Sequence, residues 1–295
     1  MSEPKPVISL SQAYRQHPRH WRDYFYVYPV ISRRSKGLSI GINLNPDKAC
    51  NFDCIYCQVD RTTPGPAKGV EISALAAELD ALLDAAVDLS LFRESPFDAL
   101  PVEQRAVRDI ALSGDGEPTT YPRFDEAVEV IARAKKAHGL DAAKIVLITD
   151  ACYLTKPQVK RGLAIMDENN GEIWAKLDAG TEAYYQLVNR PNYPLAHVIE
   201  NIIDAARVRP LVIQSLWMKV HGAGPTDEEV AAFCDRLNEI VAAGGDIKLV
   251  QVYTIARQTT EAYATVLGVE ALGHIGSMVR GRTGLAVETF GGSEA

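Results

Sequence analysis

Three cysteines occur within eight residues, at positions 50, 54 and 57 of the segment CNFDCIYC. Thiolates are soft ligands for zinc, copper(I) and iron–sulfur clusters. The spacing C-x3-C-x2-C therefore leaves four interpretations: a disulfide, a zinc site, an iron–sulfur cluster, or a chance group of buried side chains. Five cysteines are an odd number and a poor disulfide framework. A structural zinc site usually takes four ligands in two close pairs, and the remaining Cys152 and Cys234 stand alone in the sequence.

Three close thiolates without a fourth partner fit a four-iron cluster that leaves one iron open to a small ligand. Such an open position is typical of catalytic rather than structural metal sites. Cys234 falls in a predicted amphipathic helix, where a small buried residue is the simpler interpretation. Cys152 follows a predicted strand, so a role for it at the site stays open.

Short β-branched runs alternate with amphipathic stretches along the chain. Strands are predicted at 38–44, 107–114, 143–149, 172–178, 211–220 and 246–254, and helices at 72–87, 123–139, 195–208 and 226–244. The last helix begins at Thr226, with Glu229 three residues later, which is the pattern of a capping box. Alternating strands and helices indicate an α/β fold with a parallel sheet, either doubly wound or an incomplete (β/α) barrel. In both folds, ligands bind at the carboxyl ends of the strands.

The segment Cys50-Asn-Phe-Asp-Cys54-Ile-Tyr56-Cys57 follows the first predicted strand and resembles the cluster motif of the radical S-adenosylmethionine (SAM) superfamily, C-x3-C-x-aromatic-C. The resemblance implies a partial (β/α)6 barrel in which the three cysteines hold a [4Fe–4S] cluster and SAM binds the open iron. In that family, reduction of the cluster cleaves the cofactor to a 5′-deoxyadenosyl radical that abstracts hydrogen. The resemblance also implies an oxidoreductase or synthase that receives electrons from a donor such as flavodoxin or ferredoxin.

The segment ALSGDGEPTTYP (111–122), after the second predicted strand, resembles the family's GGE segment, which holds the methionine amino group of SAM. Glycines let a backbone approach a ligand closely. Asp150 stands after the third strand, where many relatives carry an asparagine. Lys176 and Asp178 point to one face of the fourth strand, either as ligand contacts or as an inward ion pair. The residues that the resemblance assigns to the cofactor are Tyr56, Gly114, Asp115, Gly116, Glu117, Asp150, Lys176, Asp178, Gln251 and Tyr253.

Over roughly residues 28 to 260, the sequence resembles the group related to the tRNA wyosine-base synthases. Those enzymes carry a second four-iron cluster on three further cysteines and a lysine that forms a Schiff base with pyruvate, whereas only Cys152 and Cys234 remain here. The net charge of −7 also disfavours a large tRNA-binding face. We expect a small-molecule substrate; a tRNA base is the alternative, and a non-catalytic metal-binding module is a third.

The expected organisation is an N-terminal extension (1–37), a radical SAM core (38–260) and a C-terminal extension of a helix and a strand (261–295). The aromatic segment 20–37 suits an edge strand, a cap or a lid, and the irregular segment 91–106 suits a lid or a docking site. The basic cluster SRRSKG (32–37) is interpreted as solvated. No apolar run reaches the roughly 18 residues of a membrane span and no secretory signal pattern is present, so we expect a cytoplasmic protein.

Overall fold

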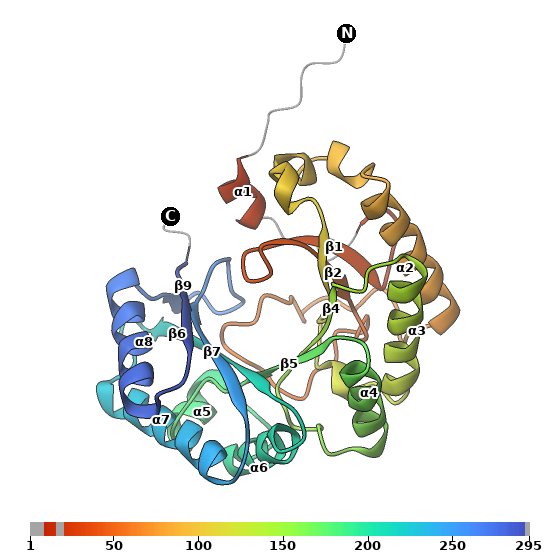
Figure 1. The fold of residues 1–295 in the computed structure, drawn as a ribbon. Helices are drawn as coiled ribbons and strands as arrows, with labels where there is room; N and C mark the ends of the chain where they lie inside the picture. The colour runs from red at the N-terminus through yellow and green to blue at the C-terminus, as the bar shows by residue number, and fades with distance from the viewer. Residues whose placement is uncertain (1–8, 16–20, 293–295) are drawn as a thin grey trace.

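A mostly parallel sheet curls into an incomplete barrel in the computed structural model, which describes residues 9–15 and 21–292 (Figure 1). Its order is β1-β2-β3-β4-β5-β6-β7-β9, with β8 paired to β6. Strands β2 to β7 and β9 are parallel, whereas β1 and β8 run antiparallel to their partners. The strands span Val27–Ser32 (β1), Gly37–Ile42 (β2), Val107–Leu112 (β3), Lys144–Thr149 (β4), Gly171–Lys176 (β5), Leu211–Val220 (β6), Ile247–Thr254 (β7), Ala264–Val266 (β8) and Val287–Phe290 (β9).

Each of the strands β2 to β7 is followed by at least one helix on the outside of the curled sheet (Figure 1). The helices span Leu10–Arg15 (α1), Ile72–Val87 (α2), Phe124–Ala137 (α3), Pro157–Asp167 (α4), Glu182–Asn189 (α5), Leu195–Ala206 (α6), Asp227–Ala242 (α7) and Val269–Thr283 (α8). Six consecutive strand–helix units confirm the predicted partial (β/α)6 barrel. Strand β9 then adds a further parallel strand beside β7.

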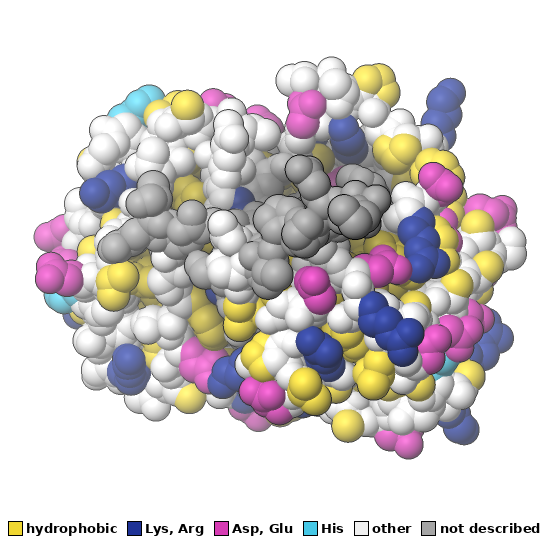
Figure 2. Space-filling view, turned by 90° about the horizontal axis from the view of Figure 1, so that it is seen from above, with side chains coloured by type: hydrophobic (Ala, Val, Ile, Leu, Met, Phe, Trp, Pro, Cys, Tyr) yellow, Lys and Arg dark blue, Asp and Glu magenta, His cyan; other side chains and the backbone are white. Residues whose placement is uncertain are grey.

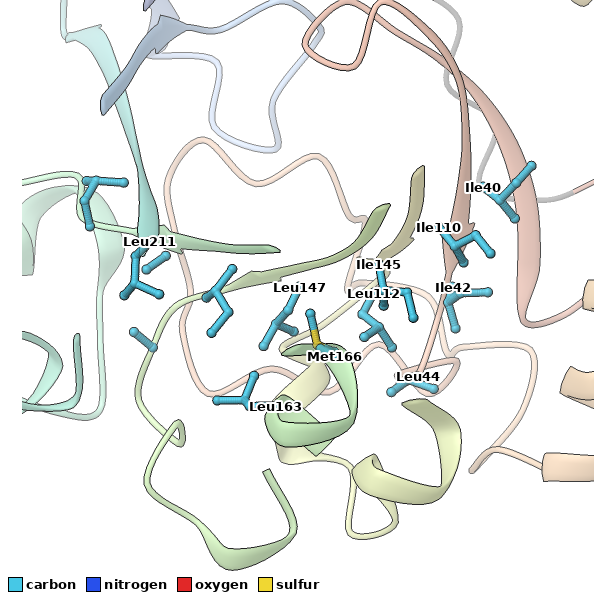
Figure 3. Packing of buried hydrophobic residues seen from close by; sticks show 14 of the residues in the cluster. Ile40, Ile42, Leu44, Ile110, Leu112, Ile145, Leu147, Leu163, Met166 and Leu211 are labelled. Atoms are coloured by element: carbon cyan, nitrogen blue, oxygen red, sulfur yellow. The ribbon is translucent and has the colours of Figure 1, made fainter. Parts of the chain in front are cut away.

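The outer face of the sheet packs the main hydrophobic core against the helices. Alternate residues such as Ile40 and Ile42 on β2 or Ile145 and Leu147 on β4 are fully buried there (Figure 3). The opposite face of each strand points into the barrel, because side chains alternate along a strand. That inner face carries polar residues at the carboxyl ends, so the fold itself directs chemistry-bearing groups toward one interior space.

The predicted capping box of α7 forms only in part. Thr226 Oγ1 accepts from the backbone N of Glu229 at 3.3 Å, as the pattern requires. The Glu229 carboxylate turns away instead, and accepts from Gly180 N at 2.6 Å and Thr181 Oγ1 at 2.5 Å. It therefore ties α7 to the loop after β5, a contact between distant segments that the local pattern does not contain.

The aromatic N-terminal segment supplies the edge strand β1, apart from residue 20, which lies outside the described residues. The irregular segment 91–106 forms three 3-10 turns, Leu91–Arg93, Phe97–Ala99 and Val102–Gln104. It buries Phe92, Phe97 and Leu100 in the core and does not line the interior cavity described below. No helix in the described ranges is both long and apolar enough to cross a bilayer.

Candidate active site

A cavity of about 320 Å³ occupies the carboxyl-terminal end of the barrel interior. This volume lies within the usual range of small-molecule sites, roughly 300–1,000 Å³. Figure 1 shows the connection between β2 and α2, which carries the three cysteines, crossing the open centre of the curled sheet. The predicted site residues that line the cavity are Cys50, Cys54, Tyr56, Cys57, Gly114, Asp115, Gly116, Glu117, Asp150, Lys176, Asp178 and Tyr253. Gln251 does not line it; this residue lies behind the wall and accepts from Gln214 Nε2 at 2.8 Å.

The cysteine loop is fastened to the end of α5 by backbone contacts. Ile55 N donates to Val188 O at 3.0 Å, and Phe52 forms an isolated bridge with Pro191. Asn192 Nδ2 donates to Asn51 O at 2.9 Å. The loop thus has a fixed position although it contains no helix or strand of its own.

The three thiols are free and partly buried on the cavity wall. Burial raises the pKa of Cys50 to about 11 and that of Cys54 to about 12, so both are neutral thiols in the protein alone. Metal binding converts such thiols to thiolates and releases their protons. No three Cys, His, Asp or Glu side chains among the described residues are arranged around one metal ion; the thiols share a wall rather than a single point. Three unpaired soft donors in this arrangement fit a multinuclear cluster.

Arg61 touches one of these sulfurs and the neighbouring loop. Its Nη1 lies 3.0 Å from Cys57 Sγ, Nη2 donates to Asp115 O at 3.2 Å, and Nε donates to Lys48 O at 3.1 Å. This one side chain therefore links a predicted cluster ligand to the glycine-rich turn and to Lys48. The sequence interpretation did not single out Arg61.

The glycine-rich turn after β3 is wedged against the cysteine loop. Asn43 Oδ1 accepts from Asp115 N at 3.1 Å and its Nδ2 donates to Asp115 Oδ2 at 2.8 Å. A Cβ on Gly116 would lie 2.0 Å from Ala49 O, and one on Gly114 would lie 2.3 Å from Asn43 Oδ1. Both glycines are therefore required by close approach, and the turn is packed directly against the loop at Gly116.

Glu117 and Asp150 form a buried carboxyl pair beside this turn. Glu117 accepts from Thr119 Oγ1 at 2.5 Å, Thr149 Oγ1 at 2.6 Å and Asp150 N at 2.8 Å. Asp150 Oδ1 accepts from Cys152 N, whereas Asp150 Oδ2 is buried without a hydrogen bond in the described structure. Burial raises the pKa of both carboxyls, and the charge of Glu117 raises that of Asp150 further. Asp150 lines the cavity, so this buried oxygen lies close to the space that a ligand would occupy.

Asp178 joins the cysteine loop to the end of β5. It accepts from Leu216 N at 2.8 Å, Asn189 Nδ2 at 3.0 Å, Lys176 Nζ at 3.2 Å and the Tyr56 hydroxyl. Asn189 Nδ2 also lies 3.6 Å from Cys54 Sγ. Four donors use the acceptor capacity of this carboxylate, so its role is to position its neighbours.

Several residues outside the prediction also reach the cavity. Arg33 and Arg34 line it, so the interpretation of SRRSKG as a merely solvated cluster is wrong for these two side chains. Cys152 and Cys234 are buried in the core and do not line the cavity. The basic cluster itself is the only sequence feature that could have identified the two arginines as cavity residues. No sequence feature identifies Asn189, because its partners lie far away in the sequence.

Comparison with known proteins gives a match to the Radical SAM superfamily model over residues 44–237. A UPF0026 protein of Helicobacter pylori is 26% identical over 215 residues, covering 71% of this chain and 62% of that protein. A UPF0026 protein of Synechocystis is 30% identical over 168 residues, covering 56% of this chain and 52% of that protein. The chain thus spans less than two thirds of the length of these relatives.

Among solved structures, the fold is shared with a structure of TYW1 with a lysine-pyruvate adduct bound. The TM-score is 0.53 at 13% sequence identity, and the alignment covers 82% of this chain and 73% of that one. At this identity the similarity concerns the fold alone.

Proposed function

The chain belongs to the radical SAM superfamily, whose enzymes use a [4Fe–4S] cluster and SAM, and from this membership we propose that it reductively cleaves SAM to act on a small-molecule substrate. The observation that carries the proposal is the convergence of Cys50, Cys54 and Cys57 with the glycine-rich turn on one cavity wall. When bound, the reduced cluster and SAM supply a 5′-deoxyadenosyl radical that abstracts hydrogen. Every other contribution comes from the side chains of the cavity.

We assign cluster binding to the three cysteines and cofactor binding to Tyr56, the turn Gly114–Glu117 and Asp150. The close packing of Gly116 on the cysteine loop fixes the cofactor turn relative to the cluster ligands. Asp150 Oδ2 is an unused acceptor for a hydroxyl or ammonium group of SAM. Asp178 acts by holding Tyr56 and Lys176, and Gln251 acts by holding Gln214.

A small substrate is favoured by the size of the cavity, about 320 Å³, and by the distribution of charge. Figure 2 shows Lys and Arg side chains interspersed with Asp and Glu over the face seen there. Recognition of a tRNA would instead use a continuous basic surface, because phosphate contacts depend on Lys and Arg.

A tRNA base remains the second candidate, since the fold is shared with TYW1. Lys176 is the only lysine that lines the cavity within the described residues. Burial alone would lower its pKa, but the charge of Asp178 and the Tyr253 hydroxyl raise that pKa above its usual value. The ammonium form of Lys176 is therefore favoured, and the residue would have to lose a proton before it could form a Schiff base with pyruvate. This observation weakens the second candidate.

The proposal includes a one-electron donor, such as a flavodoxin or ferredoxin. We further propose residues 38–260 as the catalytic core. In this division the N-terminal extension supplies the edge strand β1, and the C-terminal extension supplies α8 and β9.

The test is anaerobic reconstitution with iron and sulfide, reduction with dithionite in the presence of SAM, and chromatography of the nucleoside products. We expect 5′-deoxyadenosine, and its loss in Cys54→Ala. Cys234→Ala is the matched control, because this cysteine is buried away from the cavity. Methylthioadenosine as the product would mean that a different carbon–sulfur bond breaks. A preparation that binds zinc and no iron would overturn the proposal.

A further inference from the structure

Arg34 extends from the turn between β1 and β2 into the barrel interior and lines the cavity. Its guanidinium carbon lies 5.3 Å from the ring centre of Trp174 and 5.2 Å from that of Tyr253. Burial raises the pKa of the Asp109 carboxyl and the charge of Arg34 opposes that rise, but the two side chains form no ion pair within 4 Å. Asp109 instead accepts a hydrogen bond from Ser39 Oγ at 2.5 Å. Within the described ranges, Arg34 makes no hydrogen bond or ion pair. Its N–H groups therefore have no acceptor within the described part of the protein, and the side chain is only half-buried, so they face solvent in the cavity.

Lys176 and Tyr253 present two more donors to the same space. Lys176 Nζ donates to Tyr253 Oη at 2.8 Å and to Asp178 Oδ1 at 3.2 Å, which uses two of its three hydrogens. The Tyr253 hydroxyl accepts from Lys176, and its own hydrogen has no acceptor among the residues that the structure places. Arg34 and Lys176 lie on the same ring, at 5.2 and 5.3 Å from the Tyr253 centre. Two cations and a hydroxyl thus converge.

Arg34 lies at the deep end of the cavity, whereas Lys176 extends toward the cysteines, with its Nζ 5.0 Å from the ring centre of Tyr56. Trp174 and Lys176 share the inward face of β5, and Trp174 is two residues further from the carboxyl end, a rise of roughly 7 Å. Because Arg34 lies over Trp174, it is deeper than Lys176. The adjoining wall includes the apolar side chains of Val30, Ile148 and Phe290. A ligand here would have one charged end in the depth and an apolar body toward the cluster.

We propose that Arg34, Lys176 and Tyr253 form a subsite for an oxyanion of the substrate, a carboxylate or a phosphate. The inference rests on the proposed function and names its substrate class: a small anionic molecule anchored at the deep end, with its reacting carbon toward the cysteines. A planar guanidinium presents paired N–H groups that match either oxyanion. Cation–π attraction to the rings of Trp174 and Tyr253 holds this group in the cavity before the ligand arrives. On binding, an oxyanion would replace solvent as the acceptor of these N–H and O–H donors.

The experiment is anaerobic calorimetric titration of the reconstituted protein, saturated with SAM, using inorganic phosphate and, separately, succinate. Variants are Arg34→Met, which keeps the length of the stem, and Arg34→Lys, which keeps the charge but loses the paired N–H groups. Arg33→Met is the matched control, since it removes a neighbouring cavity arginine whose Nη1 donates to Gly291 O at 2.9 Å. Circular dichroism of each variant establishes that it is folded.

We expect one probe to bind the wild type and Arg33→Met with similar affinity. The affinity of Arg34→Met for that probe should be lower by a factor of about ten or more. Preference for phosphate or for succinate identifies the oxyanion. Equal binding by all variants, or no binding of either probe to the wild type, would overturn the subsite. If Arg34→Met does not fold, Arg34→Lys and Tyr253→Phe give the same comparison. Arg34-dependent binding in a protein that does not cleave SAM would refute the proposed function and leave the subsite standing.

Discussion

Replacement of Asp178 by asparagine should destabilise the apoprotein far more than the loss of an exposed carboxylate. Asp178 is buried and accepts four hydrogen bonds, from Leu216 N, Asn189 Nδ2, Lys176 Nζ and the Tyr56 hydroxyl. An asparagine has one acceptor oxygen and a donor NH₂ group in place of the second. Whichever way the amide turns, part of this set faces a donor instead of an acceptor, and Lys176 loses its counter-charge.

The size of the effect follows from burial. Removing one partner of a buried ion pair costs about 3–5 kcal/mol, because a buried charge remains uncompensated. The control is Asp204→Asn, which breaks a pair with Lys160. That pair is shorter, 2.8 Å against 3.2 Å for Lys176 and Asp178, but its side chains are 51% and 47% exposed. Solvent screening limits such a pair to about 0–1 kcal/mol. Distance alone would make the Lys160–Asp204 pair the stronger of the two, whereas burial makes the Lys176–Asp178 pair the stronger.

The assay is urea unfolding of the metal-free variants, since the midpoint reports stability when the slope is unchanged. We expect the midpoint of Asp178→Asn to fall several-fold further than that of Asp204→Asn. Equal midpoints would show that the Asp178 network is not a major source of stability, and the reasoning on how the cysteine loop is held would fail.

Three further predictions concern the cofactor side of the cavity. Gly116→Ala places a Cβ 2.0 Å from Ala49 O, so we expect a loss of about 1–3 kcal/mol and weaker SAM retention in equilibrium dialysis. The control is Gly273→Ala, whose Cβ meets nothing within 4 Å; inside helix α8 this change should raise stability by about 0.5–1 kcal/mol and leave SAM retention unchanged. Burial raises the pKa of Asp150 above its usual 3.8, so the carboxyl loses its proton at a lower pH in the unfolded chain than in the folded protein. The urea midpoint of the apoprotein should therefore fall as the pH rises from about 4 through the folded pKa, and Asp150→Asn should reduce this dependence of the midpoint on pH. Arg61→Met removes the cation beside a proposed cluster ligand, and a loss of about 1.4 kcal/mol of stabilisation of the reduced cluster would lower its reduction potential by about 60 mV. The potential is measured by a redox titration followed by electron paramagnetic resonance, and an unchanged value would contradict stabilisation of the reduced cluster by Arg61.

The features that local sequence encodes were predicted well. The cysteine spacing and the glycine-rich turn each lie within a dozen residues, and their geometry follows from the strands that precede them. The helix predicted at 72–87 is α2, because its apolar residues repeat at helical spacing over four turns. Shorter elements such as α5, with eight residues, carry too few repeats to be recognised.

The contacts that organise the site join segments far apart in the sequence. Tyr56 and Asp178 are separated by 122 positions, and Asn189 and Cys54 by 135. Hydrophobic periodicity does not predict contacts between such distant residues, so the sequence alone does not indicate a role for Asn189 at the site. Arg34 was misread for the same reason: a basic turn is usually solvated, and only the curl of the sheet brings this one over Trp174 on a strand more than a hundred residues away.

Lys176 connects the two ends of the cavity. Its ammonium bonds Tyr253 at the deep end and Asp178 at the cluster end, and Asp178 in turn bonds Tyr56 and Asn189, which lies 3.6 Å from Cys54 Sγ. Because the charge of Asp178 raises the pKa of Lys176, the ammonium form of the lysine is favoured in this arrangement. The same charge, with one N–H unused, is suited to attract an anion. The carboxylate that positions the cysteine loop thus also favours the charged form of the lysine, which is the form that the proposed oxyanion subsite requires.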